Sequence, residues 1–201
     1  TSFDVGLILN NELPRAFRPR ICRHGLAIPV VEIASIGTGG GSIARFDEAL
    51  GILRVGPESA GSTPGPVCYG RGGSEPTLTD AAATLGYISR LGAMELNLDA
   101  AREAVGRLAQ AMSMSVERTA QGIVDVACAQ MADLIRRTTI QHGHDPASFE
   151  LYAYGGAAPQ YAGLYAAELG LGGVTIPHLA PEFSAWGAIC TELAVEVEAE
   201  V

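Results

Sequence analysis

The sequence predicts an α/β fold built on a mixed, mostly parallel sheet with flanking helices. In the first half of the chain, short apolar runs rich in β-branched residues stand next to glycine-rich turns. In the second half, strand-like and helix-like segments alternate from residue 149 to residue 193. This alternation is typical of strand–helix–strand units, which join parallel strands, so parallel pairing is expected.

The first half holds three expected strands and an unusually glycine-rich connection. Strands are expected over residues 3–9, 28–36 and 52–55, where apolar and β-branched residues are frequent. Eleven of the 25 glycines lie between residues 37 and 73, so the backbone there must turn tightly or approach another segment closely. A loop of this length is uncommon in a compact domain unless it is functional.

The second half is expected to be mainly helical. Residues 116–141 show the strongest helical periodicity, with Ser115 as the N-cap and Gly143 beyond the end. Asp99 is expected to cap the preceding helix. The other expected elements are helices over 79–91, 99–112, 159–169 and 181–193 and strands over 149–154 and 173–176.

Composition excludes several functional classes. The chain has 201 residues, of which 13 are basic and 22 acidic, giving a net charge of −9 with neutral histidine. Without a cluster of Lys and Arg, this balance argues against a nucleic-acid-binding surface. No run of about 18 apolar residues is present, so no membrane-spanning helix is expected. The four cysteines form no CxxC pair, and we expect reduced thiols, as in a cytoplasmic protein.

Polar residues precede the first expected strand. Thr1 and Ser2 offer hydroxyls and Asp4 offers a carboxylate, the groups that bind phosphate oxygens and the water shell of Mg²⁺. The alternative is a turn whose polar side chains bond their own backbone. On these residues alone, the short motif favours the turn.

A run of glycines follows the expected strand that ends at Ile36. Backbone N–H groups of Gly39, Gly40 and Gly41 can surround an anion because no Cβ blocks the approach, and Ser42 can add a hydroxyl. The run matches neither the dinucleotide-binding nor the Walker pattern. A glycine-rich turn that allows two segments to pack closely is an equally good interpretation.

The proline- and glycine-rich stretch 55–73 specifies one backbone path toward Asp80. The polar groups that this path can present are Glu58, Ser59, Arg71, Thr79 and Asp80. The alternatives are a rigid interface loop and, for Asp80, a cap of the following helix. Cys68 has no histidine nearby, so a structural thiol is expected rather than a nucleophile.

Gly155 and Gly156 separate an expected strand from an expected helix. Paired glycines allow a flat ring such as adenine to lie against the backbone. A left-handed turn explains the pair equally well.

Taken in order, these segments resemble the hydantoinase A family, which includes N-methylhydantoinase, ATP-dependent 5-oxoprolinase and subunits of acetone and acetophenone carboxylases. The matching segments are TSFDV (1–5), GTGGGSIA (37–44), VGPESAGSTPGPVCYGRGG (55–73), TLTDA (77–81), YGGAAP (154–159) and SAWG (184–187). Because family members are longer, we expect residues 1–201 to be part of a hydantoinase A domain, truncated at both ends and inactive alone. Residues 1–95 are expected as a Gly/Pro-rich region and residues 96–201 as a nucleotide-binding α/β lobe.

The resemblance implies a lobe of an actin- and hexokinase-like ATPase that uses ATP and Mg²⁺. It places Thr1, Ser2 and Asp4 near phosphate, with Asp4 holding Mg²⁺ through water. It places Gly155 and Gly156 near the adenosine of ATP.

The resemblance also implies ATP-dependent opening of a small cyclic amide, hydantoin or 5-oxoproline, through phosphorylation of its carbonyl. Residues 39–42, Glu58 and Arg71 are then expected near the substrate, and Asp80 is expected to be catalytic. The expected partner is a hydantoinase B-type subunit or domain within an oligomer. The alternatives are a subunit of an ATP-dependent ketone carboxylase and a noncatalytic assembly domain with a decayed nucleotide site.

Two positions depart from the family pattern. Many members carry histidine where this chain has Ala34 and Tyr161. Any metal-binding or proton-transfer role of those histidines is therefore absent here, which leaves the substrate and the activity open.

Overall fold

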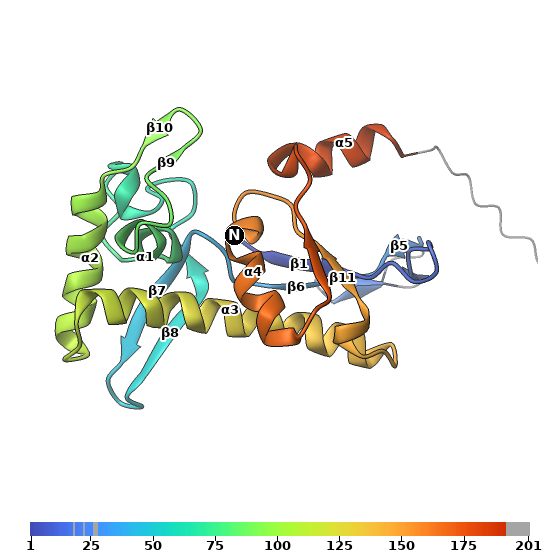
Figure 1. The fold of residues 1–201 in the computed structure, drawn as a ribbon, viewed down its shortest axis with the longest axis horizontal. Coiled ribbons are helices and arrows are strands. Elements are labelled where there is room, and N and C mark those ends of the chain that lie inside the picture. The colour runs from blue at the N-terminus through green and yellow to red at the C-terminus, as the bar shows by residue number, and fades with distance from the viewer. Residues whose placement is uncertain (18, 22, 26–27, 192–201) are drawn as a thin grey trace, which may run out of the picture.

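The computed structural model describes residues 1–191 except residues 18, 22, 26 and 27 (Figure 1). It has the α/β class that the sequence predicts. The helices are α1 (Leu78–Thr84), α2 (Leu98–Ala111), α3 (Val116–Gln141), α4 (Ala158–Leu169) and α5 (Phe183–Ile189), with 3-10 turns η1 (Val67–Tyr69), η2 (Pro146–Ser148) and η3 (Ala180–Glu182). The strands are β1 (Phe3–Gly6), β2 (Arg15–Ala16), β3 (Arg20–Ile21), β4 (His24–Gly25), β5 (Val30–Val31), β6 (Ile33–Ile36), β7 (Ser42–Asp47), β8 (Ile52–Ser59), β9 (Arg90–Leu91), β10 (Met94–Glu95), β11 (Glu150–Tyr152) and β12 (Gly173–Thr175).

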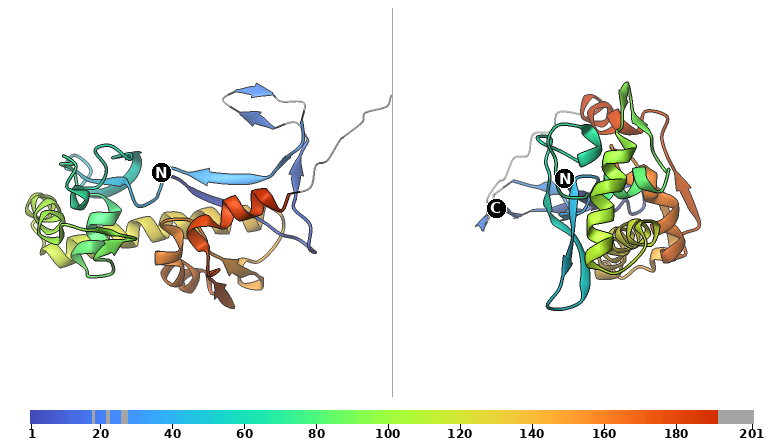
Figure 2. Two further views of the ribbon diagram at one scale, coloured as in Figure 1. Left: turned by 90° about the horizontal axis from the view of Figure 1, so that it is seen from above. Right: turned by 90° about the vertical axis from the view of Figure 1, so that its left-hand side faces the viewer.

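The long helix α3 is the element on which the rest of the fold packs. The Oγ atom of Ser115 accepts a hydrogen bond from the Arg118 N–H at 3.3 Å, which confirms the expected N-cap. Helix α3 packs against α1, α2 and β8 in one part of the molecule and against α4, β1 and β6 in the other (Figure 1). Seen from above, the β1–β6 ribbon runs along the same direction as α3 (Figure 2). Helix α3 therefore connects the two parts.

The hydrophobic core is shared between the two halves of the sequence. Phe3 and Val55 from the first half belong to the same buried cluster as Ile123, Met131 and Tyr165 from the second. Burial of one such side chain contributes about 1.5–3 kcal/mol, so the shared cluster stabilises both halves together. The core crosses the division expected at residue 95, and that division stays a prediction.

The mostly parallel sheet is not found in the described part of the chain. Only β11 and β12 pair in parallel there, with Leu151 opposite Val174, and α4 forms the crossover between them. The other pairs, including β1 with β6 and β7 with β8, are antiparallel. The reason is connection length: β7 and β8 are joined by a short turn with Gly51 at φ +66°, which permits only antiparallel pairing.

Several element boundaries also differ from the expected ones. Strand β7 was not predicted, because its residues lie within the glycine-rich region and β7 pairs with β8 rather than continuing a local pattern. Helix α1 ends at Thr84, shortly before Gly86 adopts φ +77°. Asn97, not Asp99, is the N-cap of α2, and its side chain accepts from the Ala100 N–H at 3.0 Å.

The helix expected over 181–193 is divided into the turn η3 and the short helix α5, and residues 192–193 lie outside the described residues. The strand expected over 3–9 ends at Gly6, and Asn10 and Asn11 then turn the chain with positive φ. Among the described residues, no helix is long and apolar enough to cross a membrane.

Candidate functional site

The residues between β6 and β7, here called the glycine loop (37–41), meet the start of the chain. The hydroxyl groups of Thr1 and Ser59 are hydrogen-bonded at 2.7 Å. A Cβ atom added to Gly41 would lie 2.8 Å from Thr1 Oγ1 and 2.9 Å from Ser59 Oγ. A Cβ atom on Gly39 would lie 2.9 Å from the Thr1 methyl group. The glycines are therefore required here for the close approach of three segments.

The carbonyl groups of the glycine loop are bound from inside the fold. The Gly40 carbonyl accepts from the Thr79 N–H at 2.9 Å and from the Thr79 hydroxyl at 2.8 Å. The Gly41 carbonyl accepts from the Ala60 N–H at 2.9 Å. Within the described residues, the N–H groups of Gly40 and Gly41 donate no hydrogen bond. Two consecutive free N–H groups without side chains form the kind of concavity that binds an anion.

The far side of the glycine loop is attached to α3. The hydroxyl of Thr38 donates to the side-chain oxygen of Gln130, whose amide donates to the Val55 carbonyl at 3.2 Å. A cavity of about 430 Å³ lies on this side, lined by Gly37, Thr38 and Gln130 among others. Thr1 and Ser59 do not line it, so the cavity is separate from the cluster around Gly41.

Ser2 and Asp4 lie beside this cluster, at the start of β1. The Ser2 hydroxyl donates to Asp4 Oδ2 at 2.8 Å, and the Ser35 hydroxyl donates to Asp4 Oδ1 from the opposite position on β6. Asp4 is exposed. Among the described residues, no group of three or more His, Cys, Asp or Glu side chains could hold a metal ion. Asp4 supplies a single carboxylate. One carboxylate is enough for Mg²⁺ whose other ligands are phosphate oxygens and water.

The second predicted glycine pair lies next to the glycine loop. A Cβ atom on Gly40 would lie 3.7 Å from the Cβ of Ala157, the residue at the start of α4. Gly155 adopts φ +94°, a left-handed conformation, and Cβ atoms added to Gly155 or Gly156 would meet nothing within 4 Å. The structure thus brings the two glycine segments together and leaves open space at the second.

The start of α4 offers few donor groups. The N-cap Ala157 makes no side-chain cap, and the first turn contains no acidic residue. Pro159 has no N–H group, and the Gln160 N–H donates to the Ala157 carbonyl at 3.1 Å. The side-chain amide nitrogen of Gln160 is buried and has no hydrogen-bond partner among the described residues. The free N–H groups that fit a phosphate are therefore those of the glycine loop.

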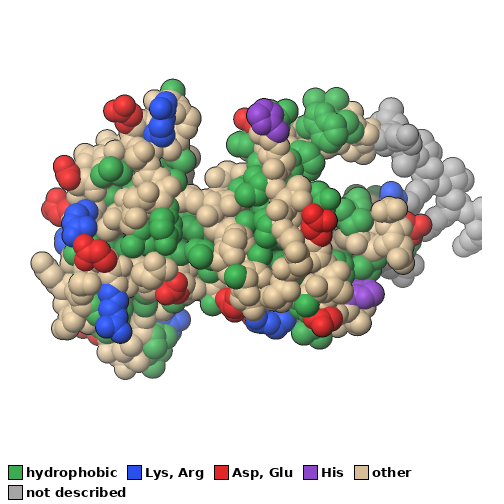
Figure 3. Space-filling model, in the orientation of Figure 1, with side chains coloured by type: hydrophobic (Ala, Val, Ile, Leu, Met, Phe, Trp, Pro, Cys, Tyr) green, Lys and Arg blue, Asp and Glu red, His purple; other side chains and the backbone are tan. Residues whose placement is uncertain are grey.

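The space-filling view shows a notch on this face of the molecule. The notch separates the part that carries β9 and β10 from the part that carries α5 (Figure 3). The N-terminal residue, Thr1, lies between these two parts (Figure 1). On the α5 side, Tyr154 packs on Phe183 at 5.2 Å between ring centroids, and Phe183 stacks on Trp186 at 5.6 Å.

Asp80 forms a helix cap that is fully buried. Its carboxylate accepts from the Thr77 N–H at 2.9 Å and the Thr77 hydroxyl at 2.8 Å, which completes a capping box at the start of α1. It also accepts from the N–H groups of Val67 and Cys68, at 3.1 and 2.7 Å. Asp80 is therefore not the N-cap that the sequence suggested: Thr77 is the N-cap, and Asp80 is the third residue of the helix, which binds back to it. The predicted catalytic role stays a prediction that this buried geometry does not support.

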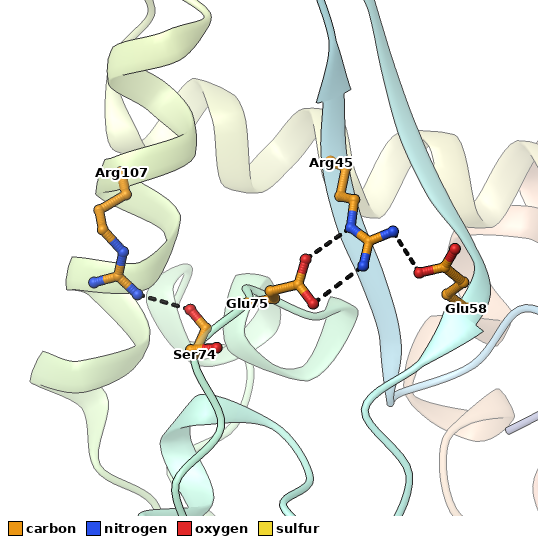
Figure 4. Close-up of polar contacts among 5 residues, drawn as sticks. All are labelled: Arg45, Glu58, Ser74, Glu75 and Arg107. Atoms are coloured by element: carbon orange, nitrogen blue, oxygen red, sulfur yellow. Dashed lines mark hydrogen bonds and ion pairs between the residues drawn. The ribbon is translucent and has the colours of Figure 1, made fainter.

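The side chains of Glu58 and Arg71 bind partners outside the glycine loop. Glu58 forms an ion pair with Arg45, which also binds Glu75 (Figure 4). The Arg71 guanidinium lies 5.8 Å from the centre of the Tyr69 ring and 3.8 Å from the Met94 sulfur. Within the described residues, neither side chain makes a polar contact with the glycine loop. Their assignment to substrate contact stays a prediction.

The cysteines that the sequence predicts to be reduced include buried thiols. Cys68 is buried and free, and burial together with Asp80 raises the pKa of its thiol, as expected for a structural cysteine. Cys128 is also buried and free, Cys190 is exposed and free, and Cys22 lies outside the described residues.

Tyr161, at a position where many family members have histidine, is buried in the core, and burial raises the pKa of its hydroxyl. Ala34 packs partly buried against the same core.

The sequence predicts Ser59 and Thr79 among the polar groups of the proline- and glycine-rich path but does not predict their contacts, and it does not assign Ala157 to the site. Ser59 and Thr1 are 58 residues apart, and Thr79 and Gly40 are 39 residues apart. No local pattern reports contacts over such separations.

Comparison with known proteins confirms the family that the motifs suggest. The family model described as hydantoinase/oxoprolinase matches residues 1–197. The chain is 40% identical over 198 residues to caprolactamase subunit alpha from Pseudomonas jessenii, covering 96% of this chain and 28% of that protein.

Two solved structures have the same fold over this region. The crystal structure of ATP-dependent caprolactamase from Pseudomonas jessenii has a TM-score of 0.84 at 41% identity, covering 94% of this chain and 28% of that chain. A nucleotide-free structure of acetone carboxylase has a TM-score of 0.85 at 34% identity, covering 93% and 27%. The chain thus spans just over a quarter of the length of these relatives. The expected likeness to actin and hexokinase stays a prediction. Matched by the family model over nearly its whole length, the chain belongs to the hydantoinase/oxoprolinase family.

Proposed function

We propose that this chain forms the phosphate-binding part of an ATP-dependent enzyme that opens a small cyclic amide. The observation that carries the proposal is the pair of free N–H groups at Gly40 and Gly41, with the hydroxyls of Thr1 and Ser59 beside Gly41. The similarity to an ATP-dependent caprolactamase supports both the nucleotide and the substrate class.

In the proposed reaction, the carbonyl oxygen of the cyclic amide takes the γ-phosphoryl group of ATP, and ADP is released. A first water adds to the activated carbon, and the ring C–N bond breaks with a proton taken up by the leaving nitrogen, which gives an acyl phosphate. A second water hydrolyses the acyl phosphate to a carboxylate and phosphate. Such chemistry depends mainly on positioning and on neutralising phosphate charge. The N–H groups of Gly40 and Gly41 would bind phosphate oxygens. Thr1 and Ser2 would donate their hydroxyls to the same group, and Asp4 would hold the water shell of Mg²⁺.

Adenine is proposed to lie at Gly155 and Gly156. Cβ atoms added at either position would meet nothing within 4 Å. Gly155 has φ +94°, a conformation that favours glycine, so a flat ring can approach the backbone there without meeting a side chain. The neighbouring rings of Tyr154 and Phe183 offer apolar surface to a base. The left-handed turn and the adenine site are compatible, because the turn creates the opening.

A ketone carboxylase is the second candidate. The acetone carboxylase structure superposes as well as the caprolactamase structure does, so the fold favours neither reaction, and the proposed phosphate site would serve either. The relative that is named as an alpha subunit supports assembly with other subunits, and we propose a hydantoinase B-type partner in a cytoplasmic oligomer. The residues at positions 34 and 161 keep a third candidate in view, a noncatalytic assembly domain with a decayed nucleotide site.

The test is ATP hydrolysis by the full-length protein with its partner subunit. Hydantoin, 5-oxoproline and caprolactam are supplied in turn, and acetone with bicarbonate is supplied separately. The proposal expects ATP turnover that one cyclic amide stimulates, with one ring opened per ATP consumed. Turnover that only ketone and bicarbonate stimulate would show a carboxylase instead. Absence of ATP binding would show a noncatalytic domain.

A further inference from the structure

Three charged side chains bridge the ends of the long proline- and glycine-rich loop. This loop, here called the 60–76 loop, leaves β8 after Ser59 and returns to α1 at Thr77. Arg45 on β7 binds Glu75 with two hydrogen bonds, Nε to Oε1 at 2.7 Å and Nη2 to Oε2 at 3.1 Å. Its third nitrogen, Nη1, donates to Glu58 Oε2. A single guanidinium group therefore holds both ends of the loop (Figure 4).

Backbone pairing explains why Arg45 can reach both glutamates. Strand β7 pairs with β8 on one side, where Ala44 lies opposite Val55. On its other side, the Ala44 N–H donates to the Pro76 carbonyl at 2.8 Å, and Ile43 forms a bridge with Thr77. Strand β7 thus lies between the outgoing and the returning end of the loop. The planar fork of arginine suits this position because it can bind two carboxylates at once.

Each glutamate lies on a segment that holds the glycine loop. Glu58 precedes Ser59, which contacts Thr1 and lies against Gly41. Glu75 lies just before α1, where Thr79 binds the Gly40 carbonyl twice. The hydrogen bond from Arg45 lowers the pKa of Glu75, so this carboxylate is charged at neutral pH. The two arms of Arg45 end beside the two contacts that fix Gly40 and Gly41.

We propose that Arg45 is a positioning residue that holds the glycine loop in its anion-binding shape through Glu58 and Glu75. Arg45 does not touch the loop itself, so it acts through Ser59 and Thr79. The nucleotide readout below rests on the proposed function, whereas the shape of the loop does not. The structure also gives Glu58 a partner that its predicted role at the substrate did not include.

A matched control lies in the same hairpin. Arg54 on β8 pairs with Asp47 on β7 at 3.1 Å, and its side chain is 55% exposed, against 48% for Arg45. Arg54 lies directly opposite Arg45 in the hairpin, but its partner Asp47 lies nearer the hairpin turn. Within the described residues, Arg54 makes no hydrogen bond or ion pair with either glutamate, with Ser59 or with Thr79. Both ion pairs are exposed, and such pairs contribute little to stability, so Arg45→Ala and Arg54→Ala should lower the stability of the fold by similar small amounts.

The experiment compares the full-length wild-type protein with Arg45→Ala, Arg45→Lys and Arg54→Ala. Hydrogen exchange without nucleotide is measured for peptides covering residues 37–42 and 59–61. Arg45→Ala should exchange faster in both peptides, Arg45→Lys should restore only part of the protection, and Arg54→Ala should match the wild type. Wild-type exchange in Arg45→Ala would overturn the proposal.

ATP titration gives the second readout. Arg45→Ala should raise the Kd for ATP about threefold to fivefold, within what an exposed ion pair can contribute, and Arg54→Ala should leave it unchanged. The double variant Arg45→Ala/Glu58→Gln should bind no worse than Arg45→Ala alone, because both changes remove the same contact. Equal Kd values for Arg45→Ala and Arg54→Ala would overturn the role in nucleotide binding. If the wild type binds no ATP, the proposed function fails, and hydrogen exchange alone decides the role of Arg45 in shaping the loop.

Discussion

At the scale of single residues, the structure separates polar groups that hold the fold from polar groups that remain free for a ligand. The carboxylate of Asp80 accepts four hydrogen bonds inside the protein. The N–H groups of Gly40 and Gly41 donate none within the described residues. The sequence presents both sets as polar or glycine-rich loop residues, and only their partners distinguish the two roles.

Replacement of Asp80 should loosen the 60–76 loop. In Asp80→Asn, an NH₂ group replaces one acceptor oxygen, so N–H groups of Val67, Cys68 or Thr77 lose their partner at a cost of about 2–4 kcal/mol. Hydrogen exchange in the full-length protein should show the amides of residues 67–69 losing protection. Asp125→Asn is the control, because Asp125 is an exposed carboxylate that accepts from Gln121. Unchanged protection at residues 67–69 would contradict the assigned role.

His142 should make the stability of this region depend on pH. The backbone hydrogen bond to the Thr138 carbonyl, at 2.9 Å, and Glu32, 3.4 Å away, raise the pKa of His142. The stabilisation is therefore complete below the ordinary histidine pKa, near 6.5, and is lost as pH rises through the higher folded pKa. The unfolding free energy of wild type minus His142→Gln should be larger at about pH 6 than at about pH 8, by a few tenths of a kcal/mol. A difference that grows with pH would contradict this sign.

At the scale of elements, local patterns predicted helices better than strands. The periodicity and cap of α3 lie within the sequence that forms it, so its bounds were predicted correctly. Strand β7 depends on β8 and on the returning segment at Pro76, and no local pattern reports such pairing. The parallel unit β11–α4–β12 was predicted from its alternation, whereas the hairpins that make most of the described pairs antiparallel were not.

The cap of α2 provides a test at this scale. The Asn97 side chain accepts from Ala100, so Asn97→Ala should cost about 1 kcal/mol. Asp99 lies in the first turn and acts only through the helix dipole, so Asp99→Ala should cost about 0.3–1 kcal/mol at low salt and less at high salt. Chemical denaturation of each variant, together with hydrogen exchange of residues 98–102, separates the effects of Asn97 and Asp99. A larger loss for Asp99→Ala would restore the cap that the sequence suggested.

At the scale of the whole molecule, the candidate site exists only when distant segments meet. The start of the chain, the glycine loop, the end of β8, α1 and the start of α4 converge around Gly40 and Gly41. The sequence predicted Thr1, Ser2, the glycine loop and the Gly155–Gly156 pair as separate candidates. Their convergence required the shared core on α3, which no single motif contains. Glu58 pairs with Arg45, and Arg71 lies beside the Tyr69 ring. These tertiary contacts, too, are not evident from a single motif.

In the proposed function, Gly40 and Gly41 bind the phosphate of ATP. Calorimetric titration of ATP into the full-length protein and its Gly41→Ala variant tests it most directly. The added Cβ would lie 2.8 Å from Thr1 Oγ1 and 2.9 Å from Ser59 Oγ, so the loop must shift. Gly106→Ala is the control, because its Cβ would lie at an ordinary 3.7 Å from Val116 in the interior of α2, where alanine is the better helix former. We expect the Kd for ATP to rise about tenfold or more in Gly41→Ala, a loss of about 1.4 kcal/mol or more of binding free energy. In Gly106→Ala, we expect the Kd to be unchanged. Wild-type affinity in Gly41→Ala would contradict phosphate binding at Gly40 and Gly41.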